Sequence, residues 1–304
     1  MKYSRKLLLA VAAFAAGITA ASPAIAQSGG PVRDLLGRIL NPPAPANPGL
    51  TVFGMTTDGR LISFSVNTPG SFQYVGFLAG FTGGDTSVVG IDYRVQDGLL
   101  YAVGNAGGVY TVNTNNAVLT FVNRTTVPLS GTAFGVDFNP AADRLRIISN
   151  NGQNLRHNVN AGGVTLLDGQ LSYAPTATPL VVAQGVVSAA YTNNDLAGST
   201  GTTLFDIDST LDQIVLQIPP NSGGLTATGL AGRNFSAPVG FDIYSSRDAN
   251  GTTVANTAFA SGVNANGTSS LLSVNLLTGL VTELGALPEG VVLSDIALPL
   301  NQVP

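Results

Sequence analysis

The chain has 304 residues, of which 44% are hydrophobic and only 10% are charged, and its formal net charge is −4. It contains no cysteine and one histidine, which excludes disulfide frameworks, thiol nucleophiles, thiolate metal sites and sites built from several histidines. The charged fraction lies far below the usual ~25%, and glycine, asparagine, threonine and valine are frequent instead. This composition is typical of short strands joined by tight turns.

The first 26 residues have the pattern of a signal peptide. Three basic residues precede an apolar run over residues 7–21, and Ala24 and Ala26 then match a small-x-small cleavage pattern. We therefore expect cleavage after Ala26 and export to the periplasm or the extracellular space. The apolar run is short for a membrane span, and no later stretch comes near ~18 consecutive apolar residues, so we expect no membrane insertion.

Removal of the signal peptide makes the protein more acidic. It deletes three of the 13 basic residues and no acid, which leaves ten arginines against 17 acids and a net charge of about −7. Lys2 and Lys6 are the only lysines, so Schiff-base chemistry is excluded from the processed chain. An acidic chain without lysine suits neither phosphate backbones nor anionic lipids. We expect no nucleic-acid partner, and a monomer with an unidentified ligand or protein partner.

Residues 27–49 differ from the rest of the chain. Apolar residues recur at helical spacing over residues 31–40, and residues 41–49 contain four prolines. The pattern predicts a short helix and a proline-rich linker. This segment is interpreted as a short docking helix or a frayed end, with a partner-binding helix as the alternative.

Residues 50–304 contain a repeated pattern of four short strands. Successive copies begin at Gly90-Ile91-Asp92, Gly135-Val136-Asp137, Ser188-Ala189-Ala190 and Gly240-Phe241-Asp242, roughly 45 to 53 residues apart. This spacing suits a four-stranded propeller blade.

The two ends of this region complete one more blade. Residues 50–80 supply three strands, and residues 292–298 supply one spare strand. A propeller ring closes when the last strand joins the first blade, because closure removes exposed sheet edges. We therefore predict an all-β, five-bladed β-propeller, with a six-bladed ring or an irregular β-sandwich as alternatives.

Three segments carry a family resemblance: FGVDFNPAADRLRIISNNGQNLRHNVNAGG, AAYTNND and TTLFDIDSTLDQIVLQIPPNSGGL. They resemble an uncharacterised bacterial family, domain of unknown function 4394, over roughly residues 50–300. The resemblance implies an exported, propeller-like repeat domain and supplies no catalytic residues. His157 departs from the aliphatic residue that is usual at its position in that family.

The first candidate site is an arginine cluster around the only histidine. Arg144 and Arg146 leave the same face of a predicted strand. Asn151-Gly152 indicates a two-residue hairpin turn, which would place Arg146 opposite His157. A shift by one residue would place Arg146 opposite Arg156, and the two like charges would then need an anion between them. The functional hypothesis is an anion-binding site formed by Arg144, Arg146, Arg156 and His157; the structural alternative is pairing with nearby aspartates.

The second candidate site consists of Asp206, Asp208 and Asp212. The first two share one face of a predicted strand, and two carboxylates on one face suit Ca²⁺. The segment lacks the glycine and glutamate positions of an EF-hand loop. An Asx turn at Asp208 is the structural alternative. We expect no cofactor, with a calcium ion as the alternative.

The aspartates that recur at the start of the repeats have a different interpretation. Asp92, Asp137 and Asp242 occupy one position in the repeat, which predicts a structural hydrogen bond that fixes the geometry of each blade. Few catalytic residue types are present, so a non-enzymatic exported propeller that binds a ligand, a matrix component or a protein is favoured. The alternative function is a calcium-assisted hydrolase or lyase with its site at the propeller channel.

Overall fold

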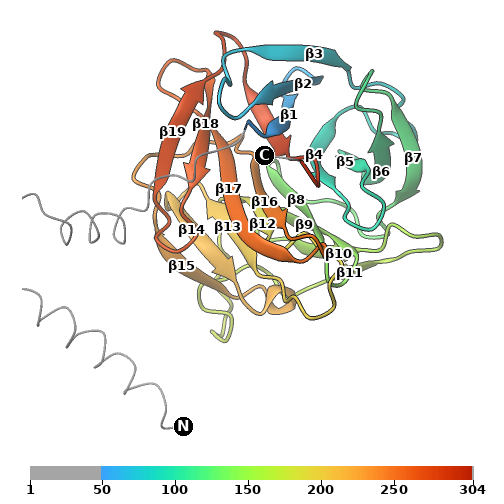
Figure 1. Ribbon diagram of the computed structural model, residues 1–304. Helices are drawn as coiled ribbons and strands as arrows, with labels where there is room; N and C mark the ends of the chain where they lie inside the picture. The colour runs from blue at the N-terminus through green and yellow to red at the C-terminus, as the bar shows by residue number, and fades with distance from the viewer. Residues whose placement is uncertain (1–48, 303–304) are drawn as a thin grey trace, which may run out of the picture. The chain divides into compact units, whose positions relative to one another are not determined.

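A computed structural model describes residues 49–302. The predicted signal peptide and the predicted helix and linker, up to residue 48, lie outside the described residues. The described chain forms five four-stranded antiparallel sheets arranged in a ring, as Figure 1 shows. This confirms the five-bladed β-propeller. No helix among these residues is long and apolar enough to cross a membrane.

The first blade is closed by the two ends of the described chain. Its strand order is β20-β1-β2-β3. The strands are β20 (Leu293–Ala297), β1 (Thr51–Thr56), β2 (Arg60–Ser65) and β3 (Phe72–Phe77).

The other four blades each use four consecutive strands. The second blade consists of β4 (Val88–Tyr93), β5 (Leu100–Gly104), β6 (Gly108–Val112) and β7 (Leu119–Arg124). The third consists of β8 (Phe134–Asn139), β9 (Arg144–Ser149), β10 (Asn154–His157) and β11 (Thr165–Leu167). The fourth consists of β12 (Val186–Tyr191), β13 (Leu204–Asp208), β14 (Gln213–Gln217) and β15 (Leu225–Leu230), with a 3₁₀ turn η1 (Pro220–Ser222) between the last two. The fifth consists of β16 (Phe241–Arg247), β17 (Thr253–Val263), β18 (Ser269–Val274) and β19 (Val281–Ala286).

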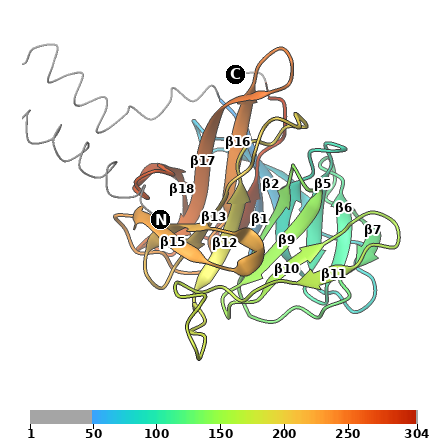
Figure 2. The same cartoon turned by 90° about the horizontal axis from the view of Figure 1, so that it is seen from below.

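One strand of each blade lies next to the propeller axis. These inner strands are β20, β4, β8, β12 and β16, and they contact one another in that order around the ring. The β16–β17 hairpin extends beyond the other blades, as Figure 2 shows.

Closure depends on the pairing of β1 with β20, in which Phe53 lies opposite Ala297 and Met55 lies opposite Asp295. Gly54 allows a close approach there, because a Cβ atom at this position would lie 2.7 Å from Leu293 Cδ2 and that side chain would have to shift. The side chain of Gln302 extends the join. Its Oε1 accepts a hydrogen bond from the Thr51 amide at 2.6 Å, and its Nε2 donates to the Thr51 carbonyl at 2.9 Å.

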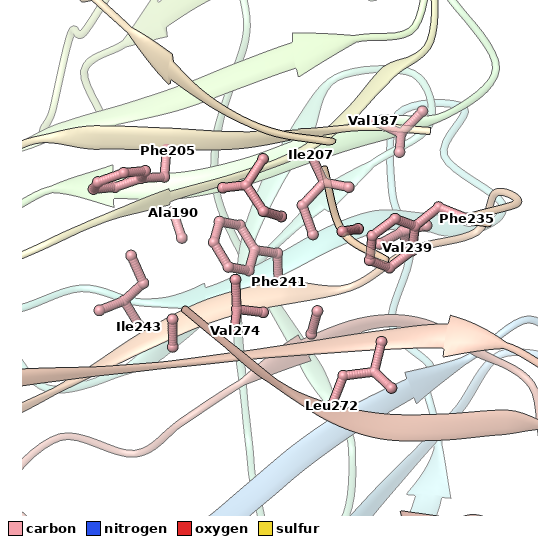
Figure 3. Close-up of a cluster of buried hydrophobic side chains, with 14 residues drawn as sticks. Val187, Ala190, Phe205, Ile207, Phe235, Val239, Phe241, Ile243, Leu272 and Val274 are labelled. Atoms are coloured by element: carbon pink, nitrogen blue, oxygen red, sulfur yellow. The ribbon is translucent and has the colours of Figure 1, made fainter. Parts of the chain in front are cut away.

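The hydrophobic core is divided among the blade interfaces. Five clusters of buried apolar side chains fill the five gaps between neighbouring sheets. Figure 3 shows the cluster between the fourth and fifth blades, where Phe205 and Ile207 face Phe241 and Ile243. Most blade faces are therefore covered by a neighbour, which explains the low charged fraction of the sequence.

Candidate binding site on the propeller axis

Three buried carboxylates converge at the axis. Asp92 on β4, Asp137 on β8 and Asp242 on β16 are 5%, 1% and 4% exposed. One carboxylate oxygen of each lies within 4.8 Å of the others, and among residues 49–302 no other three carboxylate or histidine side chains come close enough to hold one ion. We call this group the axial triad.

Each aspartate of the axial triad also joins its blade to the next one. Asp92 Oδ2 accepts a hydrogen bond from the Phe138 amide at 2.7 Å, and Asp137 Oδ1 accepts one from the Tyr191 amide at 3.1 Å. Asp242 Oδ2 accepts one from the amide of Leu298, just after β20, at 2.5 Å. The structural hydrogen bond that the recurrence predicted is therefore present.

The ring of aspartates is incomplete at two inner strands. On β12 the corresponding residue is Ala190. On β20 it is Ala297. Gly240 packs against the backbone of Asp295 and Ile296, so Asp295 is level with Gly240. The residue level with Asp242, two positions further along, is therefore Ala297. Asp295 thus lies two residues, about 7 Å, nearer the start of the inner strands. Its Oδ2 accepts a hydrogen bond from the Ile91 amide at 2.8 Å.

Electrostatics set the axial triad apart from the buried aspartates that pair with an arginine, such as Asp85 and Asp168. Burial raises the pKa of Asp92 and Asp137 well above the usual value, and the nearby charge of Asp242 raises both pKa values further. Burial raises the pKa of Asp242 to about 7, although two backbone amides oppose the shift. Within residues 49–302, no arginine forms an ion pair with these carboxylates or with Asp295. The group therefore favours bound protons or a cation over three free negative charges.

A cavity of about 640 Å³ opens at the end of the ring where the inner strands begin. We call it the axial funnel. Every blade contributes a residue from the start of its inner strand or just before it: Val89, Phe134, Val187, Val239 and Ser294. Ser294 directly precedes Asp295, so the funnel lies on the side of the axial triad from which the inner strands start.

The wall of the axial funnel is polar but carries no ionisable side chain. Its hydroxyl and amide side chains are Thr57, Ser87, Thr132, Asn150, Gln184, Ser209, Thr210 and Ser294. The apolar part of the wall comes from valine, alanine and proline residues and from Phe134. Such a wall offers many neutral hydrogen-bonding groups and no counter-charge.

Two turn asparagines fix the shape of the rim. Asn150 Oδ1 accepts hydrogen bonds from the amides of Thr132 and Ala133 at 2.9 and 3.3 Å. Asn105 Oδ1 binds the amides of Thr86 and Ser87 in the same way, at 2.8 and 3.1 Å. The sequence reasoning missed both residues. The available signal was an asparagine in the same turn of two successive repeats.

The arginine cluster lies away from the funnel, in the third blade. Arg146 pairs with Arg156 across β9 and β10, which is the shifted register considered above. The reason is a three-residue turn instead of a two-residue turn: the Ser149 amide donates to the Gln153 carbonyl at 3.1 Å, and Gly152 has a φ of 82°.

An internal carboxylate lies between the two arginines. Asp168 Oδ2 is 2.6 Å from Arg146 Nη1 and 2.6 Å from Arg156 Nε. Arg146 is 1% exposed, and it also donates to Asn154, Asn221 and the Tyr191 hydroxyl. Binding of an external anion here remains a prediction, and the anion that the structure places between the arginines is Asp168.

The other two residues of that cluster also have protein partners. Arg144 donates to the backbone carbonyls of Ala142 and Asp143. His157 is fully buried, with Nδ1 at 2.9 Å from Thr165 Oγ1 and Nε2 at 2.9 Å from Asn123 Oδ1. Burial lowers the pKa of His157 to about 4, so its ring is neutral at pH 7.

The second candidate group, Asp206, Asp208 and Asp212, is divided among separate contacts. Asp208 Oδ1 accepts hydrogen bonds from the amides of Thr210 and Leu211, both at 2.9 Å, which is the Asx-type turn given as the alternative. Asp212 Oδ1 accepts a hydrogen bond from the amide of Phe235 at 2.6 Å. Calcium binding at these residues remains a prediction.

Asp206 is the unusual member of this group. Its side chain is fully buried, and neither carboxylate oxygen has a hydrogen-bond partner within the described part of the chain. Burial raises the pKa of Asp206 well above its usual value, although the charge of Arg146 acts in the opposite direction. Burial without a partner therefore favours the protonated form of Asp206.

Fold and site together define a class: a five-bladed β-propeller with buried carboxylates on its axis and a neutral polar funnel above them. The chain belongs to the family described as domain of unknown function (DUF4394), whose sequence profile matches residues 60–297. No curated protein matches the chain.

Several solved structures are similar to the chain at low identity. A protein of unknown function from Bacteroides thetaiotaomicron has 16% identity and a TM-score of 0.46, with 83% of this chain and 64% of that chain covered. An auxiliary nutrient binding protein from Bacteroides ovatus has 13% identity and a TM-score of 0.37, with 68% and 55% covered. The computationally designed protein Ika8 has 9% identity and a TM-score of 0.33, with 78% and 63% covered. The chain spans less than two thirds of the length of each of these proteins.

Proposed function

We propose that this protein is an exported, non-enzymatic binding protein that holds an uncharged, hydroxyl-bearing small molecule in the axial funnel. The observation that carries this proposal is the composition of the funnel wall, which has eight hydroxyl or amide side chains and no ionisable one. Its volume of about 640 Å³ lies within the range of small-molecule sites. A charged ligand would lose its hydration there without gaining an opposite charge.

Several side chains of the wall are available to a ligand. Gln184, Ser87 and Thr210 are exposed, and within residues 49–302 none of their side chains forms a hydrogen bond to the protein. Phe134 offers an apolar surface on the same wall. These groups match a ligand that has hydroxyl groups on its edges and C–H groups on its faces.

Two further observations support the non-enzymatic, exported part of the proposal. General acid–base catalysis needs an ionisable group within reach of the substrate, and the funnel wall supplies none. The basic segment, apolar run and cleavage pattern over residues 1–26 support export.

A thermal melt of residues 27–304 with neutral sugars, polyols, anions and Ca²⁺ tests the proposal. A ligand at a hundred times its Kd stabilises the fold by about 2.7 kcal/mol, which raises the Tm by a few degrees. We expect a neutral polyhydroxyl compound to raise the Tm. The double substitution Gln184→Ala and Thr210→Ala should lower the affinity for that compound roughly tenfold. Gln73→Ala, an exposed glutamine on β3 outside the funnel, is the matched control. A shift with anions alone would contradict the proposal.

The second candidate function is a calcium-assisted hydrolase or lyase at the channel. The axial triad favours it, because three carboxylates that approach within 4.8 Å are suitable ligands for a hard cation. It requires that Ca²⁺ raise the Tm, that a chelator lower it, and that Asp137→Asn remove both effects. A Tm that is unchanged by Ca²⁺ and by chelator would eliminate this candidate.

A further inference from the structure

A second recess borders the axial funnel. It has a volume of about 510 Å³ and lies between the first and second blades. Thr57, Ser87, Val88 and Ser294 line both cavities, so the two form one continuous depression on the same end of the ring. We call the second recess the side groove.

The side groove is more apolar than the funnel. Met55, Phe77, Leu78 and Phe81 contribute to its wall. Its one ionisable side chain is Asp58, whose carboxylate lies 2.9 Å from Arg60 Nη2. The charge of Asp58 is therefore already compensated, and the groove offers mainly aromatic and aliphatic surface.

Each aromatic ring of the side groove has an aromatic neighbour, and that of Phe77 is Tyr74, with ring centroids 5.9 Å apart. Phe81 packs edge-on against Tyr110, with ring centroids 6.3 Å apart. Phe77 is the last residue of β3, and a bulge at Val75 shifts the pairing of β3 with β2 just before it. Phe77 is 61% exposed, so most of its ring is available to a ligand.

We infer that the ligand is a neutral oligosaccharide, with one end in the axial funnel and the adjoining sugar units in the side groove over Phe77. This inference rests on the proposed function and names its ligand class. A sugar chain presents hydroxyl groups at its edges and C–H faces to aromatic rings. The funnel supplies partners for the hydroxyl groups, and the groove supplies the ring. A single sugar would leave the aromatic side of the depression unused.

Calorimetry on residues 27–304 tests the inference, with cellotetraose, maltotetraose and xylotetraose compared with glucose and xylose. We expect one tetrasaccharide to bind at least tenfold more tightly than its monosaccharide. Phe77→Ala should remove this factor and leave monosaccharide binding unchanged. The matched control is Leu230→Ala: Leu230 lies opposite Gln213 in the fourth blade, as Phe77 lies opposite Arg60 in the first, and it is 68% exposed.

The outcomes separate this inference from the function on which it rests. Equal affinity for a monosaccharide and its tetrasaccharide overturns the oligosaccharide and leaves the funnel as a binding site. A tetrasaccharide preference that survives Phe77→Ala, or tighter binding of a neutral peptide of similar length, also overturns it. If none of these sugars binds, the inference fails; the proposed function fails with it only if the polyols of the thermal melt also leave the Tm unchanged.

Discussion

Two charged residues stand opposite each other in the third blade and have contrasting surroundings. Asp137 on β8 pairs with Arg146 on β9, and each side chain is 1% exposed. They form no ion pair, and both reach Tyr191 of the fourth blade: Arg146 donates to its hydroxyl, and Asp137 accepts from its amide. Arg146 is otherwise surrounded by compensating partners, whereas Asp137 faces two further carboxylates at the axis.

The contrast shows how to interpret a buried charge. A buried charge with a full set of partners is satisfied within the fold and has little capacity left for a ligand, and removing it leaves its buried partners uncompensated. A charge that is buried beside like charges makes stability depend on protons or cations. Arg146 belongs to the first kind and the axial triad to the second, so substitutions in the two regions should differ in their pH dependence.

The largest effect is expected at Arg146. Arg146→Met should lower the free energy of unfolding by about 3–5 kcal/mol, because Asn154 and Asn221 lose their donor and Asp168 loses one of its two arginines. Urea unfolding measures this loss. Arg144→Met is the control, with a loss below about 1 kcal/mol. A loss below about 1 kcal/mol for Arg146→Met would remove the contrast between the two regions.

The axial triad should respond to pH instead. The pKa of Asp242 is about 7 in the folded protein, so between pH 4 and 7 the folded state holds a proton that the unfolded state has released. This term makes the fold less stable as pH rises. Asparagine does not titrate, so the Asp242→Asn variant lacks this loss. Between pH 4.5 and 7.5 its free energy of unfolding should rise by about 3 kcal/mol relative to that of the wild type.

Urea unfolding at the two pH values measures the gain for Asp242→Asn. Asp143→Asn is the control, since the Arg94 guanidinium lowers the pKa of Asp143 and its effect appears only in more acidic solution. A difference between wild type and Asp242→Asn that stays constant with pH would contradict the assignment.

The features that the sequence could predict are those that follow from the repeat of the blades. The blade count and the closing strand followed from the recurring Gly-x-Asp starts and from one spare strand at the end, because a ring must pair every edge. The convergence of Asp92, Asp137 and Asp242 followed from the same recurrence but was missed. Residues at the same position of several inner strands meet at the propeller axis. The recurrence of an aspartate there is therefore compatible with a cation- or proton-binding site as well as with a structural role.

Other features depended on local geometry that the sequence does not specify. The pairing of Arg146 with Arg156 required a three-residue turn, although Asn151-Gly152 favours a two-residue turn. The partner of both arginines, Asp168, follows only after β11. The funnel wall combines residues from turns of all five blades, which no spacing in the sequence brings together.

His157 should make stability depend on pH in the opposite direction to the axial triad, with a loss in acidic solution. Its pKa is about 4 in the folded protein, so below pH 6.5 the unfolded state binds a proton that the folded state does not. Stability should therefore fall as pH drops toward 4. His157→Gln should remove about 2 kcal/mol of this loss at pH 5, as measured by unfolding at pH 5 and 8. An unchanged acid loss would mean that His157 is protonated in the folded protein.

The smallest effect is expected at the funnel rim. Asn150→Ala removes the acceptor for the amides of Thr132 and Ala133 and should cost about 1 kcal/mol without changing the pH dependence. It should also weaken sugar binding, because the rim changes shape. Asn115→Ala, at an exposed turn outside the funnel, is the control. Unaltered binding would show that the rim does not contribute to the site.

The pairing of β1 with β20 has a consequence for the order of events during synthesis. The first blade lacks its inner strand until residues 293–297 have left the ribosome, although its other three strands are made first. Until then the edge of β1 is unpaired and the ring is open. The ring therefore closes only after β20 has been made, although the strand that β20 pairs with, β1, is the first strand of the propeller to be made.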